Sequence, residues 1–111
     1  MKTRISAGLV ALVVLLLAIA AVASASSTNG KLTAFSYDSS TKVGHITVTA
    51  KHKTKYKFTS KTNCGVSQGQ SGNQVPCKSL GKSKYHNKPV SVTWTKNANG
   101  TRVASLIAVH L

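Results

Sequence analysis

The chain has 111 residues, in which 15 Lys and Arg side chains face a single acidic residue, Asp38, so that its formal net charge is +14. One carboxylate excludes the enzyme classes that use paired carboxylates as general acid and general base. A chain of this length has room for one small domain, and its excess of positive charge predicts an affinity for anions.

Residues 1–25 predict an export signal. Lys2 and Arg4 precede a long unbroken apolar run, and small residues surround a cleavage point after Ala25. This order is typical of a secretory signal peptide that is removed. The alternative is an uncleaved anchor, because an apolar run of about 20 residues spans a bilayer. Either outcome places residues 26–111 outside the cytoplasm.

Residues 26–111 are predicted to be one domain with a net charge of +12, because Lys2 and Arg4 account for two of the fifteen basic residues. Its two cysteines, Cys64 and Cys77, predict one intrachain disulfide, since disulfides persist in exported proteins. Closing that loop would stabilise the fold by about 3 kcal/mol. The alternatives are an intermolecular bridge or a metal pair, and metal is disfavoured because no metal-binding motif accompanies the cysteines.

Alternating apolar and polar residues predict five strands, and helical periodicity is absent. In the first strand the alternation groups Leu32 with Ala34, and in the third Tyr56 and Phe58 share one face while lysines occupy the other. The fifth, which includes Leu106, is apolar on both faces, so we expect it to be covered on both sides. The five predicted strands are 32–37, 45–50, 55–59, 90–94 and 103–109.

Polar segments separate the predicted strands. Asn99 and Gly100 predict a tight turn before the last strand, since glycine accepts the positive φ that hairpins need. Residues 62–88 form one long connection, and we expect it to contain a loop that the disulfide closes over 64–77. That loop is uncharged and rich in glycine and amides. We expect a surface excursion, with a binding loop for a sugar or a protein as the alternative.

Three strands, a long connection and two more strands follow the order of the OB-fold, a small Greek-key barrel, although a five-stranded sandwich has the same order. The segments GKLTA, GHITV, YKF, VSV and GTRVASLI begin at residues 30, 44, 56, 90 and 100. In these segments the chain resembles a family of exported bacterial OB-like domains of undefined function. The resemblance covers nearly all of residues 30–109 and implies the fold without supplying catalytic residues. The cysteine loop and the strong basicity depart from the family.

Five lysines of one parity are the candidate binding residues: Lys51, Lys53, Lys55, Lys57 and Lys61. Alternate side chains of a strand lie about 7 Å apart on one face, so Lys55, Lys57 and Lys61 are expected to project together. Several lysines at this spacing can contact successive phosphates and give salt-sensitive binding. The alternative is a solubilising face whose lysines protect a strand edge from pairing with other chains.

Nucleic acid is the weaker choice of anion. Proteins that bind single strands expose aromatic side chains on which bases stack, and the candidates for exposure are only Phe35, Tyr37 and Tyr85. Lysine also outnumbers arginine twelve to one in residues 26–111, whereas bidentate phosphate recognition favours arginine. These features predict diffuse attraction to a charged polymer rather than recognition of a base sequence.

The histidines are the remaining candidates for catalysis, and two histidines with a lysine can cleave RNA without metal. We expect them to be scattered over a strand face, a turn and the chain end, so that neither an enzyme nor a zinc site is predicted. No cofactor or metal is expected. The four histidines are His45, His52, His86 and His110.

We therefore expect a secreted OB-like domain, possessing one disulfide, that binds an anionic polymer at or outside the cell envelope. The candidate polymers are envelope polymers, acidic polysaccharides and extracellular nucleic acid. The first alternative is a protein-interaction or envelope structural domain whose lysines provide solubility. An RNase-like enzyme is the second alternative.

Overall fold

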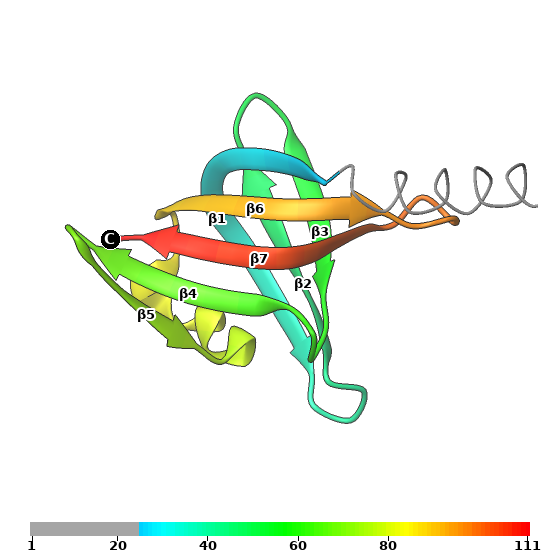
Figure 1. The fold of residues 1–111 in the computed structure, drawn as a ribbon, viewed down its shortest axis with the longest axis horizontal. Helices are drawn as coiled ribbons and strands as arrows, with labels where there is room; N and C mark the ends of the chain where they lie inside the picture. Colours follow the sequence, from blue (N-terminus) through cyan, green and yellow to red (C-terminus); the bar gives the residue numbers. More distant parts are fainter. Residues whose placement is uncertain (1–24) are drawn as a thin grey trace, which may run out of the picture.

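A computed structural model describes residues 25–111, so the predicted signal peptide, apart from Ala25, lies outside the described residues. Within residues 25–111 no helix has the length and apolar character needed to cross a membrane. The described chain consists of strands and two short 3-10 helices (Figure 1). They are β1 (Ser26–Asp38), β2 (Val43–Thr49), β3 (Lys53–Phe58), β4 (Asn63–Gln68), β5 (Ser71–Val75), η1 (Cys77–Gly81), η2 (Ser83–Tyr85), β6 (Pro89–Lys96) and β7 (Arg102–His110).

Five strands close a barrel in the order β3-β2-β1-β6-β7, and β7 returns to β3. The neighbours are antiparallel except for β3 and β7, which run parallel where Lys57 lies beside Val103. The long β1 pairs with β6 along its first half and with β2 along its second half, which joins the two sides of the barrel. The predicted OB-like Greek-key barrel is confirmed, and the sandwich alternative is excluded.

The segment over 64–77, predicted as a loop, forms a β-hairpin instead. β4 pairs in parallel with β7 from Asn63 beside Leu106 to Ser67 beside His110, and β5 pairs antiparallel with β4 (Figure 1). Glycine, serine, asparagine and glutamine have low strand propensity, so local sequence did not predict these strands. β4 is extended because its backbone groups form hydrogen bonds with the edge of β7, and β5 then pairs with β4.

The core of the barrel is a continuous apolar cluster, to which β3 contributes the rings of Tyr56 and Phe58. The two 3-10 helices add Leu80 and Tyr85 to it, so Tyr85, a candidate for exposure, is buried with only 4% of its surface accessible. Burying each large apolar side chain contributes about 1.5–3 kcal/mol. Packing of η2 against the core therefore removes Tyr85 from the three aromatic side chains that were candidates for exposure.

A β-bulge in β1 changes which side chains face the core. The register shifts between Leu32 and Ala34, so Leu32 is buried, Ala34 is exposed and Phe35 packs against the core. The predicted grouping of Leu32 with Ala34 is therefore wrong. The bulge also turns Tyr37 inward, where its ring stacks parallel to that of Phe58 with centroids 6.0 Å apart.

A second irregularity changes the faces of β7. The pairing with β6 shifts between Thr93 and Trp94, so that Ala104 is buried while Leu106 is 45% exposed. The prediction that this strand is covered on both sides is wrong, because its outer face has no second layer over it within the described residues. The tight turn predicted at Asn99 and Gly100 is confirmed, with Gly100 at a φ of 88°.

Candidate functional site

The outer face of β3 carries three of the five predicted lysines. Lys53 and Lys55 are exposed and Lys57 is half-buried, and they alternate with the buried Tyr56 and Phe58. Successive lysines on this face are therefore about 7 Å apart. The predicted separation of lysines and aromatic side chains onto opposite faces is confirmed.

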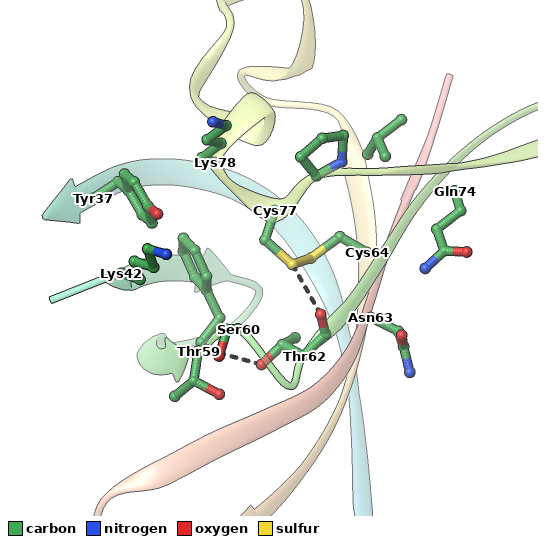
Figure 2. A pocket seen from close by; sticks show the side chains of 13 residues that line it. Tyr37, Lys42, Thr59, Ser60, Thr62, Asn63, Cys64, Gln74, Cys77 and Lys78 are labelled. Atoms are coloured by element: carbon green, nitrogen blue, oxygen red, sulfur yellow. Dashed lines mark hydrogen bonds between the residues drawn. A yellow bond between two sulfur atoms is a disulfide. The ribbon is translucent and has the colours of Figure 1, made fainter. Parts of the chain in front are cut away.

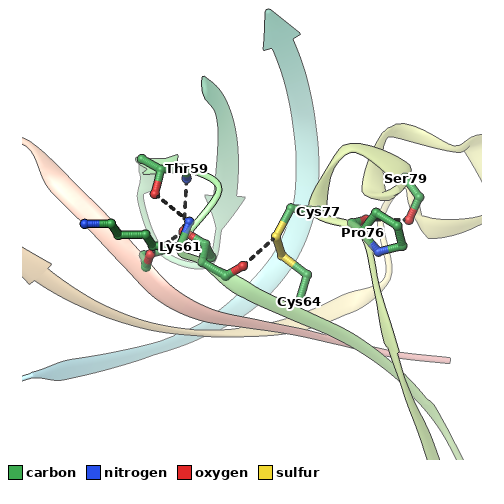
Figure 3. The surroundings of a disulfide bond; sticks show 8 residues. Thr59, Lys61, Cys64, Pro76, Cys77 and Ser79 are labelled. Carbon is green, nitrogen blue, oxygen red and sulfur yellow. Dashed lines mark hydrogen bonds between the residues drawn. A yellow bond between two sulfur atoms is a disulfide. The ribbon is translucent and has the colours of Figure 1, made fainter. Parts of the chain in front are cut away.

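The other two predicted lysines lie outside β3. Lys51 is exposed in the turn that joins β2 to β3. Lys61 is exposed in the turn that joins β3 to β4, where its backbone N–H donates a 3.1 Å hydrogen bond to Oγ1 of Thr59 (Figure 3). This turn ends the two-residue repeat of the strand. The predicted row from Lys55 through Lys61 is therefore interrupted, and Lys61 is not part of the same face of one strand.

β1 contributes a lysine that was absent from the predicted set. Lys31 is exposed and pairs with Thr49 of β2, which in turn pairs with Lys53 of β3. Paired residues share a face, and neighbouring strands are about 4.8 Å apart, so Lys31 and Lys53 face outward about 10 Å apart. Cross-strand register, which spacing along the chain does not reveal, brings them together.

β2 places a histidine beside the last lysine of β3. His45 pairs with Lys57, while the neighbouring Thr47 pairs with Lys55. Partial burial lowers the pKa of His45 below its usual value of 6.5, and the positive charges of Lys55 and Lys57 lower it further. We refer to these outward side chains and that of the adjoining turn as the basic face: Lys31, His45, Lys51, Lys53, Lys55 and Lys57.

The single acidic side chain of the chain is engaged locally. Asp38 accepts hydrogen bonds from the backbone N–H of Ser40, at 2.9 Å, and from its hydroxyl, at 2.6 Å. These hydrogen bonds lower the pKa of Asp38 below its usual value. The carboxylate thus stays ionised at the end of β1, and the hydrogen bonds it accepts come from Ser40 and not from a lysine of the basic face.

A groove of about 630 Å³ lies beside the disulfide (Figure 2). Tyr37, Lys42 and Lys78 lie at one side of it, and Asn63 and Gln74 lie at the other. Both charged groups that line it are positive. The groove combines amides, an aromatic ring and two ammonium groups, which makes it a second place where an anion can be held.

The predicted disulfide between Cys64 and Cys77 is confirmed, with Cα atoms 5.2 Å apart. It joins β4 to the start of η1, immediately after the end of β5. Sγ of Cys77 lies 3.4 Å from the carbonyl oxygen of Thr62, a contact drawn in Figure 3. The bridge therefore closes the base of the β4–β5 hairpin.

The histidines do not converge on one site. His45 lies on the basic face, whereas His110 of β7 contacts Ser67 and Ser91. The partner of Lys57 on β7, Val103, is seven residues from His110, about 20 Å along the strand. Among residues 25–111 no group of three His, Cys, Asp or Glu side chains has the arrangement to hold a metal ion.

Comparison with protein-family models gives no match for this chain, and no curated protein has a similar sequence. The resemblance to exported bacterial OB-like domains therefore stays a prediction.

Proposed function

We propose that this protein is an exported domain that binds an anionic polymer through the basic face. The observation that supports this function is the cross-strand register of β1, β2 and β3, which gathers Lys31, Lys53, Lys55 and Lys57 on one surface. The signal-like residues 1–25 and the disulfide support a location outside the cytoplasm.

The geometry of the basic face suits a charged chain rather than a small anion. Its lysines are spaced about 7 Å along β3 and about 10 Å between β1 and β3, so they contact successive charges of an extended polymer. Binding of this kind releases counterions and weakens steeply with added salt.

An acidic polysaccharide or an envelope polymer fits this face better than nucleic acid. Phe35 and Tyr37 pack against the core and Tyr85 is buried, so none of the predicted aromatic candidates lies on the basic face as a platform for bases. Tyr37 instead borders the groove beside the disulfide. The face also has lysines and no arginine. It therefore provides charge without the planar fork that reads phosphate and base edges.

The test is binding of the purified, oxidised protein to a teichoic polymer, a polyuronate and single-stranded DNA over a series of salt concentrations. The double variant Lys55→Gln/Lys57→Gln removes two charges from the basic face. We expect it to weaken binding to each polymer. For single-stranded DNA the slope of log K against log salt should fall by about 1.4, since each lost phosphate contact removes about 0.7.

The matched control is Lys82→Gln/Lys84→Gln, which removes two charges from exposed lysines of the 3-10 helical segment. We expect this control to retain most of the slope. Equal weakening by both double variants would mean that net charge, and not the basic face, is responsible. Binding that is independent of salt would also contradict the proposal.

A further inference from the structure

A second groove, of about 420 Å³, lies over the outer surface of β4, β5 and β7. The pairing register aligns its residues in rows, with Gly65 between Gln74 and Ala108 and Ser67 between Gly72 and His110. The outward side chains that line it are those of Asn63, Ser67, Gln74, Leu106, Ala108 and His110.

This groove has no lysine, arginine or carboxylate in its lining, although the chain carries 15 basic residues. Its side chains are hydroxyl, amide and imidazole groups beside Leu106, which is 45% exposed. A ligand with hydroxyl groups on its rim and apolar C–H faces complements such a mixture. A phosphate or sulfate has no cation to meet here.

Two glycines leave the floor of the groove without side chains, and at Gly72 the fold does not require a glycine. Gly72 has no left-handed φ, and a Cβ added to it would meet only Cβ of Ser67, at 4.0 Å. At Gly65 a Cβ would meet one backbone oxygen at 3.3 Å. Glycine weakens a strand, and it often marks a site where a ligand approaches the backbone closely.

A hydrogen-bonded row crosses four strands at the end of the groove. Ser91 donates its hydroxyl proton to Oδ1 of Asn29 at 2.7 Å, so its oxygen accepts from Nε2 of His110, at 3.2 Å. Nδ1 of His110 then accepts from the hydroxyl of Ser67 at 2.8 Å. This network assigns the imidazole tautomer and holds these polar groups in place before a ligand arrives.

We propose that this groove binds uncharged sugar rings of an oligosaccharide, with Gly72 and Gly65 as the floor, Leu106 beneath an apolar ring face and the amides of Asn63 and Gln74 as polar contacts. His110, whose two ring nitrogens are engaged by Ser67 and Ser91, holds the hydroxyl of Ser67 in place. The site is separate from the basic face, so the inference does not depend on the proposed function. A protein strand added to the edge of β5 is the competing occupant, but it would use backbone groups at that edge and not the surface of the sheet.

The test is titration of the oxidised protein with cellohexaose, chitohexaose and maltohexaose, followed by backbone amide NMR. Salt at about 1 M reduces the Debye length to about 3 Å and suppresses binding at the basic face. We expect saturable shifts, for at least one of the three, in residues 63–68, 71–75 and 106–110. The double variant Lys55→Gln/Lys57→Gln is expected to bind the sugar normally, which separates this site from the basic face.

The decisive variant is Gly72→Thr, which fills the groove with a residue that favours strands. We expect it to keep the thermal stability of the protein and to weaken sugar binding about tenfold or more. The matched control is Ser71→Thr, on the opposite face of β5, which is expected to bind normally. Shifts with none of the three sugars, shifts confined to the edge of β5, or full binding by Gly72→Thr would overturn the proposal.

Discussion

β3 and β4 follow each other in the chain and both run parallel to β7, yet their outward side chains differ in kind. Those of β3 are lysines, whereas those of β4 belong to Asn63, Gly65 and Ser67. If the lysines served only for solubility, we would expect them on the outer face of β4 as well as on that of β3. The outer surface of this small barrel is therefore charged over β3 and uncharged over β4, although both strands pair with β7.

The turn between β3 and β4 lies at the boundary between the charged surface and the uncharged one. The hydroxyl of Thr62 donates a 2.7 Å hydrogen bond to the carbonyl of Ala104 in β7 and accepts one from the N–H of Thr59, at 3.0 Å. Thr62 is only 9% exposed, and its hydrogen bond to Ala104 is shielded from water. One buried side chain thus fixes where β3 ends and where β4 begins beside β7.

The largest expected effect comes from removing the disulfide. The double variant Cys64→Ser/Cys77→Ser is expected to lower the free energy of unfolding by about 3 kcal/mol, because the unfolded chain gains entropy. Denaturant unfolding measures this loss. Sugar binding is expected to weaken more than polymer binding at a temperature where the variant is still folded, since the bridge closes the β4–β5 hairpin. An unchanged unfolding free energy would contradict the role of the bridge.

Thr62→Val should have the next largest effect, because it leaves the Ala104 carbonyl and the Thr59 N–H without their partner. We expect a loss of about 2 kcal/mol in the free energy of unfolding, measured with denaturant. Thr47→Val, on the outer face of β2, is the control and is expected to change stability little. Similar losses of unfolding free energy in both variants would show that the hydrogen bonds of Thr62 do not stabilise the β3–β4 turn.

The smallest effect concerns pH and separates the basic face from the uncharged groove. A bound polyanion offsets the charges of Lys55 and Lys57 and so raises the pKa of His45. Binding then takes up protons, and affinity for the polymer should rise as the pH falls below 6.5. The gain from this residue comes from the uptake of a single proton, so it is expected to be smaller than the loss caused by removing the charges of Lys55 and Lys57.

The variant His45→Gln tests this coupling in polymer titrations between neutral and mildly acidic pH. We expect it to flatten the pH dependence, while His86→Gln, at an exposed position beyond η2, leaves it intact. Folding lowers the pKa of His45, so the unfolded chain takes up the proton first and stability declines as the pH falls below 6.5. A pH dependence that survives His45→Gln unchanged would exclude this histidine as its source.

The sequence alone determined the features that depend on local pattern. Two-residue alternation identified the five barrel strands and placed Tyr56 and Phe58 opposite the lysines of β3. Strand order indicated the OB-like barrel, and the presence of only two cysteines allowed one intrachain pairing. These features were predictable because neighbouring residues, or the presence of only two partners, decide them.

The tertiary structure alone decided what depends on partners far along the chain. Pairing with β7 gives the β4–β5 segment its extended conformation despite its low strand propensity. Two bulges change which side chains of β1 and β7 face the core. The register of β1, β2 and β3 brings Lys31 to the basic face. His110, predicted only to lie at the chain end, is held by Ser67 and Ser91. Each of these outcomes depends on which strands become neighbours when the barrel closes, and spacing along one segment carries no information about that.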